Sequence, residues 1–198
     1  MGLFKRNPFG HILFLKTWLI RIAGFLTHRR YRYFNQLQIE GSEIIRSLPD
    51  TNVLFISNHQ TYFADVVAMF HVFNASLKGR ENNIKNVMYL WNPKLNMYYV
   101  AAKETMQEGL LPRILAYAGA ITVERTWRAK GKDVTEKKEV NPNDTENIKI
   151  ALEDGWVITF PQGTTRSFKP VRKGTAHIIL QHKPVVVPIV IDGFRRSF

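Results

Sequence analysis

The sequence contains no cysteine among its 198 residues. This absence excludes disulfide bonds, thiolate metal sites and a cysteine nucleophile, and it is compatible with a reducing compartment. Acidic residues are also scarce at both ends of the chain. Residues 1–40 hold seven Lys and Arg but a single acid, Glu40, and residues 166–198 hold seven against a single acid, Asp192. The residues between hold fourteen of each sign, so the net charge of +12 is concentrated at the two ends.

This distribution of charge points to partners that carry negative charge. If the two basic ends meet on one face, that face would attract anionic lipid or phosphate. A nucleic-acid-binding surface predicts a similar excess, but the sequence contains no DNA- or RNA-binding motif. A merely soluble basic protein is the third interpretation. With 45% hydrophobic and 22% charged residues, the chain should form one globular domain with a sizeable core.

The N-terminal segment lacks an uninterrupted hydrophobic run. A membrane span needs about 20 apolar residues, and Lys16 and Arg21 interrupt "HILFLKTWLIRIAGFLTHRRYRYF", in which no small-residue cleavage site is evident. In a helix, one face would carry Thr17, Arg21, Gly24 and His28, with Leu, Ile, Phe and Trp on most of the rest. The pattern favours residues 1–38 as an amphipathic helical segment lying in a membrane interface. A helix packed on the domain core and a true span remain as alternatives.

Hydrophobic runs alternate with helical patterns through the rest of the chain. Strands are expected at 51–59, 86–90, 119–125, 157–159 and 185–194, and helices at 61–73, 110–118, 145–153 and 174–182. The polar stretch 126–145 is expected to be an exposed loop. This alternation predicts an α/β fold with a mostly parallel central sheet and flanking helices.

A histidine and an aspartate follow the first of these strands. In parallel sheets, chemistry gathers where strands end and helices begin, and His59 lies at that point with Asp65 shortly after it. A neutral imidazole can accept a proton from a hydroxyl, while a carboxylate on its other nitrogen stabilises the imidazolium. A lone histidine at a strand end is more often structural. No Ser or Cys nucleophile stands nearby, so this base would activate a hydroxyl of the substrate, and a lipid hydrolase is disfavoured.

The stretch "FPQGTTRS" predicts an anion-binding turn after the strand at 157–159. Gly163 permits close backbone approach, Thr164 offers a hydroxyl and an amide, and Arg166 offers a charged fork. Gly-Thr-Thr alone is a weak signal, because any tight turn can contain it. Arg125, just after the strand "AITVE", is a second cationic candidate, with a solvated loop charge as its plainer interpretation.

Four stretches in this order resemble the glycerolipid acyltransferase superfamily, of the lysophosphatidate acyltransferase type. They are "NHQTYFAD", "GAITVER", "FPQGTTRS" and "VVVPIVI", with "AAKE" and "RKGTAHI" also matching in place. The resemblance spans about residues 40–192 and implies an acyltransferase domain over 39–198. Because the chain stops just past its last expected strand, a C-terminal segment of that domain is expected to be missing.

The resemblance also implies roles for individual residues. His59 would be the general base and Asp65 its partner. Acceptor or phosphate binding would involve Arg125, Gln162, Gly163, Thr164, Arg166 and Lys103, with Asn58, Thr61 and Lys173 in support. The family moves a fatty acyl chain from acyl carrier protein or coenzyme A to a lipid hydroxyl in phospholipid biosynthesis, without a metal or cofactor. Its bacterial members act at the cytoplasmic face of the inner membrane. An apolar groove for the chain could be lined by residues 66–73, Trp91, Tyr98 and Tyr99.

Two departures from the family pattern leave alternatives open. Five residues separate His59 from Asp65, one more than usual, and in a continuous helix one residue turns a side chain by about 100°. The pair therefore requires the extra residue to lie in a loop, which we place between Thr61 and Asp65. Gln162 stands where the family usually has Glu. Acylation of a non-phosphate lyso-lipid, such as an aminoacyl lipid, and a non-catalytic lipid-binding protein of the same fold are the alternatives.

Overall fold

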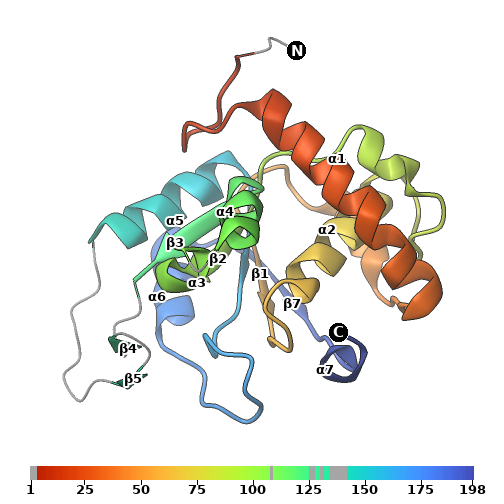
Figure 1. Ribbon diagram of the computed structural model, residues 1–198. Coiled ribbons are helices and arrows are strands. Elements are labelled where there is room, and N and C mark those ends of the chain that lie inside the picture. The colour runs from red at the N-terminus through yellow and green to blue at the C-terminus, as the bar shows by residue number, and fades with distance from the viewer. Residues whose placement is uncertain (1–3, 108, 125–127, 130–131, 134–141) are drawn as a thin grey trace.

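The computed structural model describes residues 4–107, 109–124, 128–129, 132–133 and 142–198. Its centre is a five-stranded sheet in which every pairing is parallel and the strand order is β3-β2-β6-β1-β7 (Figure 1). The strands are β1 (Val53–Ser57), β2 (Met97–Ala102), β3 (Ala120–Val123), β6 (Trp156–Thr159) and β7 (Val185–Ile189). A separate antiparallel pair joins β4 (Arg128–Ala129) and β5 (Lys132–Asp133). The predicted α/β fold is confirmed.

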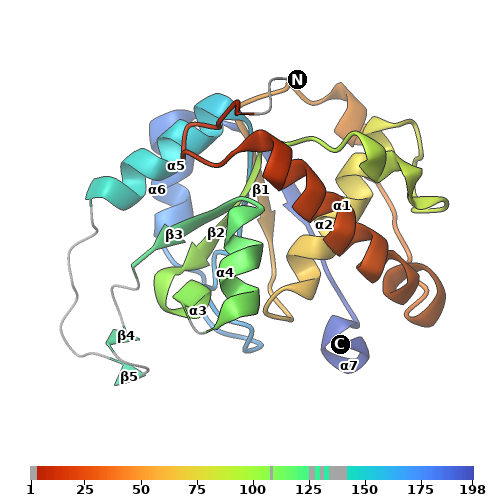
Figure 2. The same ribbon diagram turned by 45° about the horizontal axis from the view of Figure 1, so that its top comes forward.

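Helices cover both faces of the sheet (Figure 2). The α-helices are α1 (Leu13–Arg29), α2 (Ala64–Leu77), α3 (Lys103–Gln107), α4 (Leu110–Tyr117), α5 (Pro142–Asp154), α6 (Gly174–His182) and α7 (Phe194–Ser197). One π-helical turn, η1 (Arg30–Phe34), and two 3-10 helices, η2 (Ser42–Ser47) and η3 (Val87–Trp91), complete the list. The cluster containing Val53 and Phe55 packs against α1 and α2, and the cluster containing Leu54 packs against α5 and α6. Alternate β1 side chains thus enter opposite cores, as the strand repeat requires.

The strand expected at 86–90 is wrong. This stretch enters the 3-10 helix η3, and the second strand is instead β2, which pairs with β6 and β3. Asn86 adopts a positive φ of 54°, and its side chain accepts a hydrogen bond from the Met88 N–H, so the chain turns where an extended run was expected. Short apolar runs of this length do not distinguish a strand from a buried turn of helix.

The helix α1 packs on the domain through the face that carries most of its polar and small residues. Its buried residues are Lys16, Thr17, Ile20, Gly24 and His28. A β-carbon at Gly24 would lie 2.1 Å from the end of the Leu90 side chain, so glycine allows α1 to approach η3 this closely without a shift of Leu90. The opposite face is left exposed and carries Phe14, Leu15, Trp18, Ile22, Phe25 and Leu26. Within the described residues, α1 and all other helices are too short or too polar to cross a membrane.

Candidate active site

The loop between β1 and α2 lies at the carboxyl edge of the sheet and is tied to the end of β7. The Asn58 side chain accepts a hydrogen bond from the Ile191 N–H at 2.8 Å and donates to the Ile191 carbonyl at 2.7 Å. Gln60 also donates to that carbonyl, at 3.0 Å. Asn58, expected in a supporting role, therefore anchors the loop to the neighbouring strand.

The structure brings His59 and Asp65 into direct contact. His59 Nδ1 lies 2.7 Å from Asp65 Oδ2, and the Asp65 side chain is fully buried. The same carboxylate accepts hydrogen bonds from the backbone N–H groups of Gln60 and Thr61, at 2.7 and 3.1 Å, and from the Thr61 hydroxyl at 2.9 Å. Burial raises the pKa of Asp65, but the hydrogen bonds from His59, Thr61 and Gln60 outweigh it and hold the pKa below its ordinary value. An ionised carboxylate only accepts, so Nδ1 carries a proton, and in the neutral form of the ring the lone pair is then on Nε2.

The residues between the pair form a loop and not a helix. The α2 helix begins at Ala64, and Phe63 before it has a φ of −133°. Thr61, where the helix was expected to begin, lies before this helix, and its hydroxyl accepts a hydrogen bond from the Asp65 N–H at 3.1 Å. Asp65 is thus in the first helical turn, and its carboxylate folds back towards the loop. The 100° turn that a continuous helix would impose does not arise.

Phe160 forms the flat wall behind the histidine. The rings of His59 and Phe160 are stacked, with 4.1 Å between centroids and 24° between planes. Strands β1 and β6 are parallel neighbours, with Ile56 opposite Thr159, so the residues that follow both strands meet at one edge. The His59 side chain is 15% exposed, so a small part of its ring is open to solvent. Phe160 was not singled out from the sequence, because only the pairing of β1 with β6 places it beside His59.

The turn after Phe160 is held by its own hydrogen bonds. Gly163 adopts a φ of 60°, and its N–H donates to the Phe160 carbonyl at 2.8 Å. The Gln162 side-chain amide donates to the Lys169 carbonyl at 2.9 Å. A carboxylate cannot donate this bond, so Gln in place of Glu has a structural consequence in this chain. The Thr164 hydroxyl accepts from the Arg166 N–H at 3.3 Å.

The remaining predicted cations have different surroundings. The Lys103 ammonium lies 3.1 Å from the Glu124 carboxylate, and both side chains are about half exposed. Lys103 follows β2 and Glu124 follows β3, so this pair lies on the same edge of the sheet as His59 and Phe160. Arg166 and Lys173 are exposed. Arg125 lies outside the described residues.

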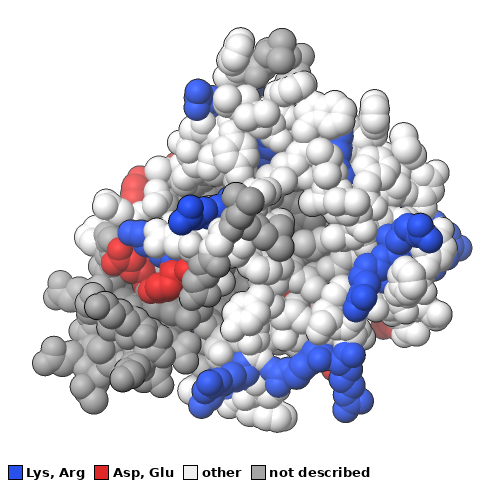
Figure 3. Space-filling view, in the orientation of Figure 1, with Lys and Arg blue, Asp and Glu red and all other residues white. Residues whose placement is uncertain are grey.

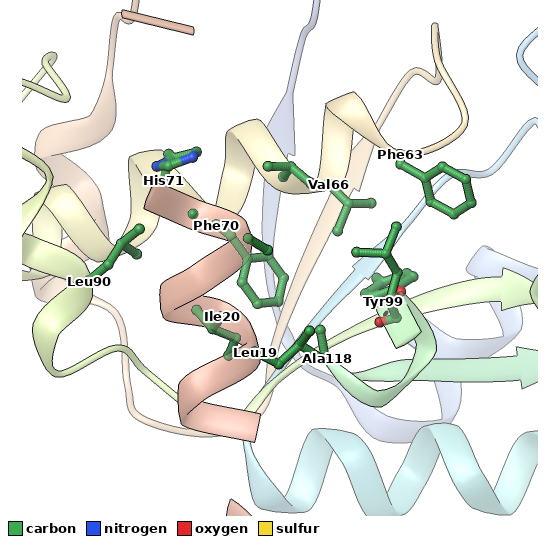
Figure 4. A pocket seen from close by; sticks show the side chains of 13 residues that line it. Leu19, Ile20, Phe63, Val66, Phe70, His71, Leu90, Tyr99 and Ala118 are labelled. Atoms are coloured by element: carbon green, nitrogen blue, oxygen red, sulfur yellow. Dashed lines mark hydrogen bonds between the residues drawn. The ribbon is translucent and has the colours of Figure 1, made fainter. Parts of the chain in front are cut away.

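An apolar pocket extends from the His–Asp loop between α1, α2, η3 and α4 (Figure 4). Phe63, Val66 and Tyr99 lie at one end of it, and His71 and Leu90 at the other. The full lining is Leu19, Ile20, Ala23, Gly24, Phe63, Val66, Val67, Phe70, His71, Leu90, Tyr99, Leu115 and Ala118. The expected contribution of Tyr99 and of part of 66–73 agrees with this lining. Trp91 and Tyr98 were also expected to line the pocket, but they do not. Trp91 packs under the Arg21 guanidinium, and Tyr98 belongs to the core on the other face of the sheet.

The far end of the pocket contains a buried polar group. His71 Nδ1 lies 2.8 Å from the Tyr89 hydroxyl, and His71 Nε2 lies 2.9 Å from the Thr27 hydroxyl. Burial lowers the pKa of His71 to about 3, so the ring is neutral at physiological pH. This histidine lies on α2 six residues after Asp65, and each of its ring nitrogens is within hydrogen-bonding distance of a hydroxyl group. The described residues contain no cluster of three or more His, Asp or Glu side chains placed to hold a metal ion.

Comparison with known proteins agrees with this arrangement. A family model described as Acyltransferase matches residues 36–192. Searches of curated proteins and of solved structures found no match. The matched residues include all five strands of the parallel sheet, the His59–Asp65 pair and the turn after Phe160.

Proposed function

The chain belongs to the acyltransferase family, and we propose that it moves a fatty acyl chain from an acyl thioester to the hydroxyl of a lysophospholipid such as 1-acyl-glycerol-3-phosphate. The thioester would be that of acyl carrier protein or coenzyme A. The observation that carries the proposal is the 2.7 Å contact between His59 Nδ1 and the buried Asp65 carboxylate. Because Nδ1 faces Asp65, Nε2 is the ring nitrogen that would act on the substrate, at the carboxyl edge of the sheet.

The pair can perform acyl transfer without a covalent enzyme intermediate. His59 Nε2 accepts the proton of the acceptor hydroxyl while the hydroxyl oxygen attacks the thioester carbonyl carbon. Asp65 stabilises the imidazolium that forms. The tetrahedral intermediate collapses, the carbon–sulfur bond breaks, and the leaving thiolate takes the proton from the imidazolium. The products are the ester and a free thiol, and the enzyme returns to its starting state.

The apolar pocket supports a lipid substrate. It begins at Phe63, two residues before Asp65, and is lined by aliphatic and aromatic side chains up to His71. Each methylene buried there contributes about 0.8 kcal/mol, which favours a fatty acyl chain over a polar substituent. We place the acyl chain of the donor in this pocket, with its thioester carbon beside His59.

The exposed face of α1 supports a reaction at a membrane surface. Its six large apolar side chains, including Trp18 and Leu26, turn away from the domain. A helix with such a face, flanked by Arg29, Arg30 and Arg32, is of the kind that lies in the headgroup region. We propose that α1 rests on the membrane with this face.

The test is acyl transfer with purified protein, a labelled acyl thioester and a panel of acceptors. The panel contains glycerol-3-phosphate, lysophosphatidate and a lyso-aminoacyl lipid, the last because Gln162 carries no charge. We expect labelled product with lysophosphatidate, and a loss of about 100- to 10,000-fold in His59→Ala and in Asp65→Asn. His177→Ala, which removes an exposed histidine on α6, is the matched control and should retain full activity.

Each other outcome rejects part of the proposal. Product that survives His59→Ala would reject the mechanism. Product formed with the aminoacyl lipid alone would reject lysophosphatidate as the acceptor but would still support the proposed mechanism. No product with any acceptor, from folded protein, would favour a lipid-binding protein that lacks the reaction.

A further inference from the structure

The loop that joins β6 to α6 extends two hydrophobic side chains into solvent. Phe168 is fully exposed, and Val171 is 70% exposed. Phe168 also adopts a φ of 58°, a conformation that bulky residues rarely take. Neither side chain packs in the core. A single exposed apolar residue is common on protein surfaces and needs no explanation. Two such residues at the end of one loop, surrounded by cations, suggest a binding surface.

Cations flank both side chains. Arg166 and Lys169 lie in the same loop and are exposed, and the exposed Arg196 lies on α7 nearby. The guanidinium of Arg195 donates to the Thr165 carbonyl, which joins α7 to the loop.

Figure 3 shows Lys and Arg side chains in a row along the lower edge of the molecule, where Figure 1 places this loop and α7. The sequence contains no Asp or Glu between Asp154 and Asp192, so no carboxylate of this segment offsets the charge. We call Arg166, Phe168, Lys169, Val171 and Arg196 the basic tip.

The basic tip has a defined base that is connected to the active site. The Gln162 amide donates to the Lys169 carbonyl, and the Arg172 N–H donates to the Pro161 carbonyl at 2.9 Å. These bonds join the two arms of the loop and hold its end outward. The Arg195 N–H donates to the Gln60 side chain at 3.2 Å, which links α7 to the loop that carries His59. The basic tip is therefore placed beside the carboxyl edge of the sheet, where the candidate base lies.

We propose that the basic tip docks on an anionic lipid surface, with Phe168 and Val171 inserted between headgroups and Lys169 and Arg196 against lipid phosphates. A hydrophobic tip surrounded by cations matches a surface whose outer layer is negative and whose interior is apolar. An acidic protein would satisfy the cations but would leave Phe168 without an apolar environment unless it offered a pocket. This contact is separate from that of α1 and goes beyond the proposed reaction. Two contacts would fix the tilt of the domain and hold His59 at the depth of lipid hydroxyls.

The test measures binding of the full chain to vesicles by flotation, without donor or acceptor. The vesicles contain phosphatidylcholine alone or with 30 mol% phosphatidylglycerol. Each cation near an anionic surface contributes about fivefold in partitioning, so we expect Lys169→Gln with Arg196→Gln to weaken binding to the anionic vesicles about 25-fold. Phe168→Ser with Val171→Ser should weaken binding to these vesicles at least tenfold. All four side chains are exposed, so the thermal unfolding of these variants should match that of the wild type.

The matched controls lie at the other end of α2. Ile44 is 47% exposed on η2, which is bonded to the end of α2 through Ser76, and Lys78 is exposed just beyond α2. Ile44→Ser with Lys78→Gln should bind both kinds of vesicle as the wild type does. Leu26→Ser on α1 should weaken binding to both kinds equally, which separates the two contacts.

Two results would overturn the proposal. The first is binding of the basic-tip variants equal to that of the wild type, which would leave an acidic protein as the occupant of the basic tip. The second is equal loss of binding in the Ile44 and Lys78 control. Because flotation needs no turnover, failure of the proposed reaction leaves this test intact.

Discussion

The imidazole of His59 stacks on the ring of Phe160 with 4.1 Å between their centroids. The two residues are far apart in the sequence and meet because β1 and β6 are parallel neighbours that end at the same edge. One face of the imidazole is covered by this ring, and Nδ1 is held by Asp65. Two independent contacts thus fix both the plane of the base and its rotation.

Substitution of Phe160 tests this positioning role. Phe160→Ala removes the wall behind His59, and we expect acyl transfer to fall about 10- to 100-fold because the base loses its fixed plane. Phe160→Tyr keeps the ring and should retain most of the activity. The measurement is kcat and KM for acyl transfer over a range of pH. A role in packing alone would lower the thermal midpoint of Phe160→Ala and leave kcat of the folded fraction unchanged.

Lys16 predicts an unusual dependence of stability on pH. The side chain is fully buried, with its ammonium 3.4 Å from the Met97 carbonyl, and burial lowers the pKa of Lys16 to about 7, against a small raising effect of Asp154. Between pH 7 and the unfolded value of 10.5 the unfolded chain binds more protons, so stability should rise with pH across that window. Over this window the free energy of unfolding can rise by at most about 5 kcal/mol.

Lys16→Met removes the titrating group and tests its contribution. We expect the variant to be more stable than the wild type at pH 7. In the wild type, folding removes a proton and the surrounding water from the Lys16 amine, and methionine avoids that cost. The difference in stability should shrink as the pH rises towards 10, and urea unfolding of both proteins at several pH values measures it. A variant that is less stable at every pH would show that the contact with Met97 outweighs the cost of burial.

The contact between Gly24 and Leu90 predicts control of acyl-chain length. Both residues lie at the end of the pocket remote from Phe63, and a β-carbon at Gly24 would displace Leu90. Gly24→Ala should therefore shorten the preferred chain, and Leu90→Ala should lengthen it. A misfit of one methylene changes kcat/KM about tenfold or more.

A series of acyl thioesters of increasing length measures this shift. Leu180→Ala, at an exposed position on α6, is the control and should leave the profile unchanged. Because Leu90 is buried, Leu90→Ala should also cost about 2–5 kcal/mol of stability, so profiles are compared at a temperature where all variants are folded. If all variants show the same dependence of kcat/KM on acyl-chain length, the acyl chain does not bind in this pocket.

Gln162→Glu tests why this chain has an amide at that position. The carboxylate cannot donate to the Lys169 carbonyl, so the two arms of the β6–α6 loop lose one connection, worth about 1 kcal/mol. We expect faster amide hydrogen exchange in residues 166–171 and weaker binding to anionic vesicles. Gln181→Glu, exposed on α6, adds the same charge without touching the loop and should change neither. Unaltered exchange in Gln162→Glu would mean that the amide does not hold the loop.

Local patterns in the sequence were sufficient for the fold class and for most of the strands. The run at Val53–Ser57 predicted a buried strand, because a strand covered on both faces needs apolar residues at nearly every position. The position of His59 and Asp65 at the end of that strand also followed from order and spacing alone. The strand at Met97–Ala102 was not predicted, because a short apolar run such as "MYYVAA" can also belong to a helix, and its pairing with β6 and β3 is what shows it to be a strand.

The tertiary structure decided what the sequence pattern leaves ambiguous. Periodicity showed that α1 has two faces, but only the folded structure shows that the polar face, with Gly24 against Leu90, turns inward and the apolar face outward. Likewise, the loop residues between His59 and Asp65 could be counted in the sequence, but only their folded path places the carboxylate on Nδ1. The sequence by itself determined which residue types follow which strand. Which side chains meet depends on strand order and helix contact, which arise from long-range packing that no local pattern encodes.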